Sequence, residues 1–238
     1  MGAPQYILIF GCALSLGIAL AKHGEPRKDS HNFFFSLLSE LVLFSILFAG
    51  GFFSNAHAQQ APQESKRWRA DLTRAAHAQW GLDAPIAALA AQLHQESRWN
   101  SNAVSRVGAT GMAQFMPGTA SWWCELNGTA KKDCQPTNPV WAIRALVGYD
   151  RWLFDRIKAS DARSQHAFML SAYNGGLGWI QRDQKLASSK GLDPLVWFGS
   201  VELVNAGRTA ANWQENRAYP KRILIELQPM YATWGPSV

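Results

Sequence analysis

The chain has 238 residues, of which 47% are hydrophobic and 17% charged, so it can bury a core and wholesale disorder is excluded. Its formal net charge is +6, and residues 59–238 carry all of this excess because residues 1–58 contain three basic and three acidic side chains. A basic domain attracts polyanions such as nucleic acid, anionic lipid or the bacterial wall. The sequence has no dense Lys/Arg run with interleaved aromatics, so a nucleic-acid partner is not predicted.

Two apolar stretches open the chain, at residues 6–21 and 33–53. The first is short for a membrane span, which needs about 20 residues, whereas the second is long enough but contains Glu40. The segment between them is polar and net basic. By the positive-inside rule this segment stays cytoplasmic, and everything after Phe53 lies outside the membrane.

The second stretch also resembles a secretory signal. Residues 41–53 match its apolar region, and Ala56 and Ala58 provide the small residues of a cleavage site. We therefore predict a hydrophobic targeting or membrane segment over residues 1–58, which is either removed after Ala58 or retained as an anchor. Export is expected in both cases. Residues 59–65 are predicted to be a linker, and residues 66–238 a globular domain.

Helical signals dominate the rest of the chain, and alternating strand patterns are nearly absent. The sequence therefore predicts an all-α fold. Gly81 and the glycine pair at 175–176 are expected to stop helices, and Pro220 to interrupt one. The expected helices cover residues 65–80, 84–95, 140–158, 161–172 and 216–234. Their expected N-terminal caps or start signals are Ser65, Asp83 with Pro85, Asn138 with Pro139, and Asp161.

Cys124 and Cys134 flank a short loop, while Cys12 lies in the first apolar stretch. In an oxidising compartment, a disulfide that closes this loop would stabilise the fold by roughly 2–3 kcal/mol. We predict this disulfide for an exported protein; the alternative is two unrelated thiols. The sequence contains no CxxC, HExxH or Cys/His cluster, so neither a metal nor a cofactor is predicted.

Glu96 is the first candidate for chemistry. It lies at the end of an alanine-rich predicted helix, and an apolar helix end beside a cleft suits a carboxylic acid that stays protonated near neutral pH. Such an acid can protonate a glycosidic oxygen and then act as a base. The signal is weak by itself, because most glutamates near helix ends are solvated or salt-bridged.

A glycine-rich stretch at residues 108–120 follows. Its three glycines permit close backbone approaches. Gln114 offers both a donor and an acceptor for a sugar amide or hydroxyl. Without further context, the stretch reads as a loop followed by the start of a helix.

Two later stretches complete the pattern. Residues 172–176 read Ala-Tyr-Asn-Gly-Gly, and Tyr173 and Asn174 can supply hydrogen bonds at a cleft wall. Residues 215–223 place Tyr219 just before basic residues. Taken singly, residues 172–176 would be interpreted as a helix end with a glycine stop, and Tyr219 as a core aromatic.

In this order and spacing the four stretches resemble the lytic transglycosylase domain of the soluble-lytic-transglycosylase type, a lysozyme-like α-fold that cleaves peptidoglycan. The family pairs Glu-Ser with Gly-x-x-Gln-x-Met-Pro, Ala-Tyr-Asn-Gly-Gly and a late tyrosine, and all four are present between residues 84 and 222. One departure is Met112-Ala113, where many members have Leu-Met. The resemblance implies that Glu96 is the catalytic acid and base. It implies substrate contacts by Ser97, Met112, Gln114, Tyr173, Asn174 and Tyr219.

Hydrolytic glycosidases use two carboxylates, but residues 97–124 contain no Asp or Glu. A sequence-near partner of the kind expected in a goose-type lysozyme, which shares the fold, is therefore missing. We predict an intramolecular reaction that breaks the MurNAc–GlcNAc β-1,4 bond and leaves a 1,6-anhydroMurNAc end. The alternatives are a hydrolytic muramidase, whose second acid would come from a distant part of the chain, and a non-catalytic wall-binding scaffold.

The expected partners are peptidoglycan glycan strands, and the membrane through the apolar N-terminal segments. The expected location is the periplasm or cell envelope, or a virion if the chain is phage-encoded. A small domain beside a membrane segment suits local wall opening for a larger secretion, conjugation or phage assembly.

Overall fold

A computed structural model of the chain describes residues 60–238 and, before them, residues 12–13, 16, 18, 20–21, 37–38 and 40–42. The chain divides into two compact units, Met1–Gln59 and Gln60–Val238. In the first unit the described residues are helical. The predicted cleavage site lies outside the described residues, as does most of the two apolar stretches. No helix among the described residues has the length and apolar character needed to cross a membrane.

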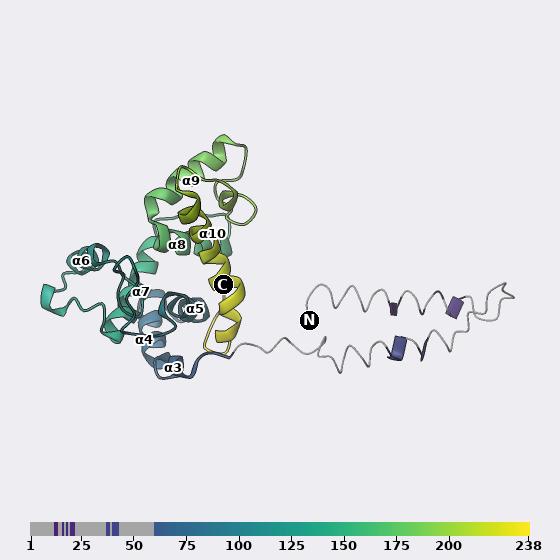
Figure 1. Ribbon diagram of the computed structural model, residues 1–238, viewed down its shortest axis with the longest axis horizontal. Coiled ribbons are helices and arrows are strands. Elements are labelled where there is room, and N and C mark those ends of the chain that lie inside the picture. Colours follow the sequence, from purple (N-terminus) through teal and green to yellow (C-terminus); the bar gives the residue numbers. More distant parts are fainter. Residues whose placement is uncertain are drawn as a thin grey trace. The chain divides into compact units, whose positions relative to one another are not determined.

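The unit Gln60–Val238 is helical, apart from two isolated β-bridges that join Thr110 to Val104 and to Phe115. The predicted all-α fold is confirmed. Its α-helices are α3 (Gln63–Lys66), α4 (Arg69–Trp80), α5 (Ile86–Ser97), α6 (Pro117–Leu126), α7 (Pro139–Phe154), α8 (Ala162–Gly175), α9 (Leu177–Ser189) and α10 (Ala210–Lys221) (Figure 1). Three short 3₁₀-helices are also present: η1 (Lys131–Asp133), η2 (Val201–Leu203) and η4 (Gln228–Tyr231). The segment η3 (Arg222–Leu227) is a π-helix.

Two of the predicted helix caps are confirmed. The side chain of Asn138 accepts hydrogen bonds from the first backbone N–H groups of α7 at 3.0 and 3.1 Å. Asp161 accepts one from the backbone N–H of Ser164 at 2.7 Å and so caps α8. Both side chains satisfy backbone donors that a helix start leaves without an intrahelical partner.

The predicted caps Ser65 and Asp83 are wrong. Ser65 is buried inside the short helix α3, where its hydroxyl donates to the Pro62 carbonyl at 2.6 Å. Helix α5 begins after Pro85 without any side-chain cap. Its first turn is instead buried in the core, so packing supplies the stability that a cap would otherwise add.

Two helices were not predicted as such. The sequence indicated only a helix start at Pro117, where α6 forms, and it treated Gly176 as the end of a helix. Gly176 does end α8, with a φ of 95°, but the chain enters α9 at the next residue. A glycine stop predicts where one helix ends, but not whether another begins at once.

The C-terminal helix changes its winding after Pro220. Proline has no N–H to donate and its ring crowds the carbonyl four residues earlier, so a regular α-helix is disturbed there. In this chain α10 ends at Lys221 and the wider π-helix η3 follows. The predicted interruption at Pro220 is thus a change of helix type, a feature that often accompanies functional sites.

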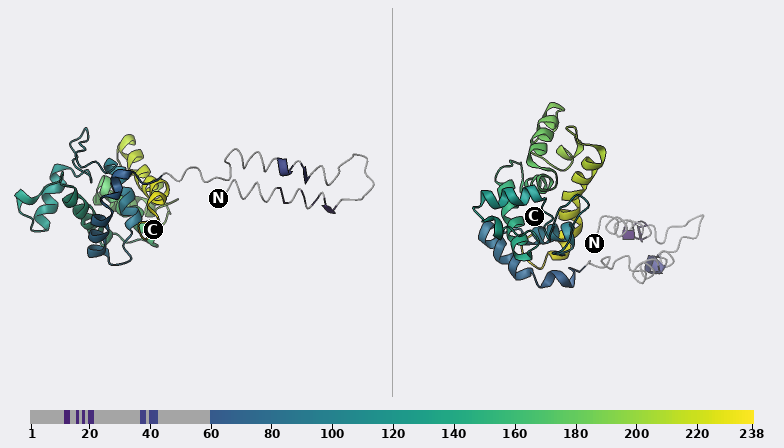
Figure 2. Two further views of the ribbon diagram at one scale, coloured as in Figure 1. Left: turned by 90° about the horizontal axis from the view of Figure 1, so that it is seen from below. Right: turned by 60° about the vertical axis from the view of Figure 1, so that its left-hand side comes forward.

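The core is organised around α5, in which every residue from Ile86 to Leu93 is buried. Helix α4 packs against α7, and the C-terminal segments η3 and η4 pack against α5. Helix α8 packs against α7, α9 and α10. Figures 1 and 2 show α8, α9 and α10 grouped at one end of this unit, with the C-terminal segment running back along α5. The end of α5 therefore lies close to the junction of α10 and η3.

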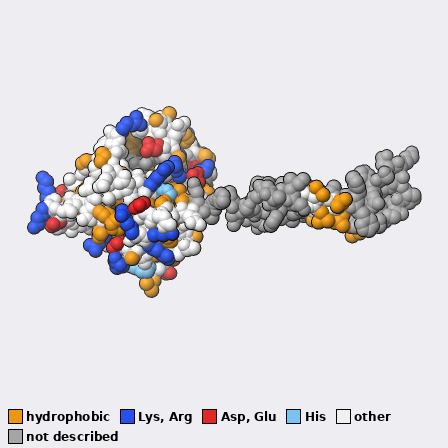
Figure 3. Space-filling view, turned by 60° about the horizontal axis from the view of Figure 1, so that its bottom comes forward, with side chains coloured by type: hydrophobic (Ala, Val, Ile, Leu, Met, Phe, Trp, Pro, Cys, Tyr) orange, Lys and Arg blue, Asp and Glu red, His pale blue; other side chains and the backbone are white. Residues whose placement is uncertain are grey.

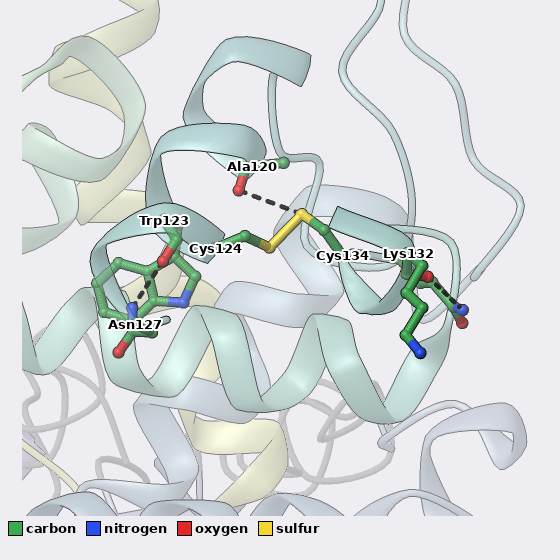
Figure 4. The surroundings of a disulfide bond; sticks show 7 residues. Ala120, Trp123, Cys124, Asn127, Lys132 and Cys134 are labelled. Atoms are coloured by element: carbon green, nitrogen blue, oxygen red, sulfur yellow. Dashed lines mark hydrogen bonds between the residues drawn. A yellow bond between two sulfur atoms is a disulfide. The ribbon is translucent and has the colours of Figure 1, made fainter. Parts of the chain in front are cut away.

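The predicted disulfide between Cys124 and Cys134 is present, with the two Cα atoms 5.9 Å apart. It joins the end of α6 to the turn after η1 (Figure 4). The loop then reaches Pro136, whose carbonyl oxygen would lie 1.8 Å from a Cβ at position 111. Only glycine fits at Gly111, so the segment directly after Cys134 packs against the glycine-rich stretch.

Reduction of this disulfide is expected to lower the melting temperature of the full-length protein. Its loop is short, with a sequence separation of 10, so the stabilisation is roughly 2–3 kcal/mol and the loss roughly 5–10 °C. Thermal unfolding followed by circular dichroism, with and without reductant, measures this shift. The double variant Cys124→Ser/Cys134→Ser is the control and should not respond to reductant. An unchanged melting temperature in the wild type would contradict the prediction.

Candidate active site

A cavity of about 450 Å³ opens at the C-terminal end of α5. Side chains from α5, α6, α7, α8 and α10 and from the glycine-rich stretch line it. Predicted site residues from all four sequence stretches thus meet in one place. Those that line the cavity are Glu96, Gln114, Tyr173, Asn174 and Tyr219.

Glu96 is half-buried at the cavity wall, and its Oε1 atom accepts a hydrogen bond from the Tyr219 hydroxyl. Burial raises the pKa of Glu96 to about 8; the Tyr219 hydrogen bond opposes this change, and the nearby charge of Glu215 adds to it. Removal from water is the largest cause and therefore determines the direction. The carboxyl group holds its proton at neutral pH and can act as an acid.

The backbone directly after Glu96 is held in an unusual conformation. Arg98 and Trp99 both have positive φ angles, of 52° and 69°, a region that residues with a Cβ seldom occupy. The Trp99 ring is buried, and its N–H donates to the Tyr231 hydroxyl at 2.8 Å. Packing of this indole therefore holds the strained turn that ends α5, and with it the position of Glu96.

Ser97 and Met112 do not line the cavity. The Ser97 hydroxyl donates to the Met112 backbone carbonyl at 2.7 Å, and the Met112 side chain is fully buried in the core. The structure therefore places neither side chain at the cavity wall, where the predicted substrate contacts would have to be made. Their hydrogen bond instead ties the end of α5 to the glycine-rich stretch.

Gln114 also has a positive φ, of 50°. Its side-chain N–H₂ group donates to the carbonyls of Ala103 at 3.1 Å and Gly111 at 2.8 Å, and so closes the loop on itself. The Oε1 atom has no partner within residues 60–238. The amide nitrogen is therefore structural, and the amide oxygen is the acceptor that Gln114 can offer a ligand.

Helix α8 contributes two polar side chains. The Tyr173 hydroxyl donates to the Ala113 carbonyl at 2.7 Å, and the Asn174 side-chain oxygen accepts from the Asn216 amide at 3.0 Å. Burial, followed by the charge of Glu96, raises the pKa of Tyr173 well above its usual range. The phenol therefore stays neutral, and both side chains are held in place by partners outside the cavity.

Glu215 is a second carboxylate in the cavity wall, and sequence reasoning missed it. It is exposed, and on α10 it lies one turn before Tyr219. Residues four apart share a helix face. The spacing of Glu215 and Tyr219 in the sequence could therefore have indicated that both side chains face the same cavity. The acid-free interval 97–124 correctly excludes a sequence-near partner for Glu96, but a distant acid does reach the cavity.

Asp150 lies buried near the cavity, without lining it. Its Oδ1 atom accepts a hydrogen bond from Gln92 at 3.2 Å, and its Oδ2 atom has no partner in the described structure. Burial raises the pKa of Asp150 well above its usual range and so favours the neutral carboxyl, whereas the Gln92 hydrogen bond opposes this change. Its sequence signal was its position as the single acid of the apolar helix α7.

Charged side chains of both signs are interspersed on the face of the described unit that Figure 3 shows. In the view of Figure 3, Lys and Arg side chains are spread over the described unit, with Asp and Glu side chains between them. Among the described residues, no group of three or more His, Cys, Asp or Glu side chains is placed to hold a metal ion. The cavity wall itself offers carboxyl, phenol and amide groups.

The substitution Tyr219→Phe should raise the pKa of Glu96 further above its wild-type value of about 8. The hydroxyl donates to the carboxylate and stabilises the charged form, so its loss favours the protonated form. Carboxyl-carbon NMR titration of the full-length protein measures the change. Tyr149→Phe is the matched control: Tyr149 lines the same cavity but forms no hydrogen bond to Glu96. A Glu96 that titrates near the ordinary value of a glutamate would contradict the prediction.

The profile of the transglycosylase SLT domain family matches residues 71–195, which is more than half of the chain. Together with a helical domain that presents a half-buried acid to a cavity, this match defines the class. The chain belongs to the transglycosylase SLT domain family.

Curated relatives carry the name membrane-bound lytic murein transglycosylase F. The protein from Shewanella denitrificans is 36% identical over 110 residues, which cover 46% of this chain and 21% of that protein. The protein from Alteromonas mediterranea is 33% identical over 110 residues, covering 46% and 22%. The match therefore spans about a fifth of the length of these relatives.

Solved structures of soluble lytic transglycosylases are also similar to this chain. The 70 kDa enzyme from Escherichia coli is 17% identical with a TM-score of 0.49, covering 90% of this chain and 38% of that one. An inactive mutant of lytic transglycosylase Slt from Pseudomonas aeruginosa is 22% identical with a TM-score of 0.48, covering 84% and 27%.

Proposed function

We propose that the chain is a peptidoglycan lytic transglycosylase that breaks the MurNAc–GlcNAc β-1,4 bond, with Glu96 as both acid and base. The observation that carries the proposal is a carboxyl group with a pKa of about 8 at the wall of a cavity lined by phenol and amide side chains. Membership of the SLT family and the names of the relatives support it.

In the first step, Glu96 donates its proton to the glycosidic oxygen, and the bond from that oxygen to C1 of MurNAc breaks. GlcNAc leaves with a hydroxyl group. The carbonyl oxygen of the neighbouring N-acetyl group bonds to C1 and takes up the developing positive charge. The Tyr219 hydroxyl already donates to the Glu96 carboxyl, so it stabilises the carboxylate as it forms.

In the second step, the Glu96 carboxylate removes the proton from the 6-hydroxyl of the same MurNAc. The 6-oxygen bonds to C1 and the bond between C1 and the N-acetyl oxygen breaks, which closes the 1,6-anhydro ring. Glu96 is protonated again and ready for another cycle. No water is consumed, so the reaction does not require a second carboxylate to activate one.

A hydrolytic muramidase is the second candidate, because Glu215 also lines the cavity. In that reaction Glu215 would activate a water molecule for attack at C1. A non-catalytic wall-binding scaffold is disfavoured by Glu96, because a binding site gains nothing from a half-buried carboxyl with a raised pKa.

Digestion of purified sacculi by the full-length protein in ¹⁸O-labelled water should separate these candidates. A transglycosylase releases muropeptides lighter than lysozyme products by the mass of one water, without label and resistant to borohydride reduction. Glu96→Gln should lower the rate at least roughly a hundredfold with an unchanged circular dichroism spectrum, because the isostere cannot supply the proton. Glu215→Gln should retain the activity. Labelled, reducible products that disappear in Glu215→Gln would instead establish a hydrolase.

We also propose that the protein acts at the cell envelope, exported and either membrane-anchored or released, and that it opens the wall locally for a larger secretion, conjugation or phage assembly. The basic charge of residues 59–238 and the disulfide support an extracytoplasmic site of action. Cell fractionation followed by N-terminal sequencing should find the protein outside the cytoplasm, beginning either near Met1 or after Ala58. A reduced, cytoplasmic protein would contradict this proposal.

A further inference from the structure

A chain of aromatic rings leads out of the candidate active site. Tyr173 and Tyr149 line the cavity, with ring centroids 5.5 Å apart. Trp122 and Trp152 both contact Tyr149 at 5.9 Å, and their own centroids are 5.2 Å apart. Neither tryptophan lines the cavity itself. Because each ring contacts the next, the four rings form a continuous path from the cavity wall to the outer surface.

Helix geometry explains this path. Thr119 of α6 and Tyr149 of α7 both line the cavity, and Trp122 and Trp152 follow them by three residues. Residues three apart lie on the same face of a helix. Each tryptophan therefore lies one turn along its helix from a cavity-lining residue, and the two helices bring the indoles together.

Trp122 is the member of this group that faces solvent. It is 39% exposed, and every other Trp, Phe or Tyr side chain within residues 60–238 is buried or half-buried. Its indole N–H has no hydrogen-bond partner among those residues. An exposed tryptophan with a free N–H is uncommon, because this side chain normally buries its ring or finds a partner for its donor.

The exposed ring is nevertheless held rigidly. Trp122 crosses Tyr149 at 73° and Trp152 at 78°, which are edge-to-face contacts. Trp152 is in turn covered by the Arg156 guanidinium, 3.9 Å from its ring centroid. These contacts fix the orientation of Trp122 before any ligand arrives, so little side-chain entropy is lost on binding.

From this arrangement we propose that Trp122, supported by Trp152, is an outer binding subsite for a sugar ring of the glycan strand, beyond the sugars in the cavity. The proposal rests on the proposed function, since it concerns the same substrate. A pyranose ring presents a face of C–H groups that can stack on an indole, and hydroxyl and acetamido groups that can accept from its N–H. Continuity with the cavity through Tyr149 identifies the occupant as a segment of the bound strand.

The surroundings of Trp122 argue against a protein partner. Its neighbours Ser121 and Glu125 on α6 are exposed and polar, and Leu126 is the exposed apolar side chain one turn further along the helix, so the apolar surface on α6 is little wider than two side chains. A stable protein interface buries roughly 800 Å² on each partner, far more than one tryptophan offers. A single ring is sufficient for one sugar.

Kinetics on substrates of different length test the subsite. In the full-length protein, Trp122→Ala should raise KM for long glycan strands roughly tenfold more than it raises KM for a short muropeptide that fills only the cavity. Trp122→Tyr should restore most of the loss. The matched control is Leu126→Ala, which removes an exposed aliphatic side chain one turn further along α6 and should change neither KM. Circular dichroism verifies that each variant is folded.

A binding experiment separates failure of this inference from failure of the proposed function. Retention on purified sacculi is compared between the variants Glu96→Gln and Glu96→Gln/Trp122→Ala. This measurement does not depend on turnover, because both variants lack the Glu96 carboxyl group. Weaker retention of the double variant supports the subsite even if the wild type proves not to be a transglycosylase. Equal retention, or equal changes in KM for long and short substrates, overturns it. Concentration-dependent self-association that Trp122→Ala abolishes, with unchanged KM, would assign the ring to a second copy of the chain and also overturn it.

Discussion

The hydrogen bond between the Tyr219 hydroxyl and the Glu96 carboxyl is the contact on which the site depends. It joins residues 123 positions apart in the chain, so it exists only when α5 and the C-terminal segment pack together. The buried α5 supplies one half of this arrangement. The other half comes from α10, where the change to π-helical winding after Pro220 lets the chain continue along α5. A partly desolvated carboxyl needs such a partner, because an unsatisfied buried polar group is costly.

Burial raises the pKa of Glu96 and the Tyr219 hydrogen bond lowers it, and the effect of burial is the larger. The same environment raises the pKa values of Asp150 and Tyr173, so these two neighbours of Glu96 also favour their neutral forms. This pattern differs from that of a metal site or an ion-pair network, in which charges of opposite sign compensate one another. It suits an acid that must donate one proton and then take one back.

How much of this was predictable depended on how local each signal was. Asn138 and Asp161 were predicted as caps because a cap depends on a few neighbouring residues, and Glu96, Gln114 and Tyr219 were found because each lies in a short, specific stretch. Ser65 and Asp83 were misassigned because tertiary packing, rather than a cap, begins the first helices. Glu215 and Asp150 were missed because their nearness to Glu96 arises only in the folded tertiary structure. The burial of Met112 likewise depends on tertiary packing, and no local pattern distinguishes it from the exposed Met116.

Helix α6 connects the cavity to the disulfide. Its first turn lines the cavity through Thr119, Trp122 is one turn further on, and Cys124 near its end is bonded to Cys134. Its packing on α7 is close, since a Cβ at Gly148 would lie 2.9 Å from the Trp123 ring. A helix whose Trp123 ring contacts α7 and whose end carries a covalent bond cannot easily rotate. In an oxidising compartment the disulfide therefore restrains the wall that carries Thr119 and Trp122, which links the stability of the loop to the geometry of the site.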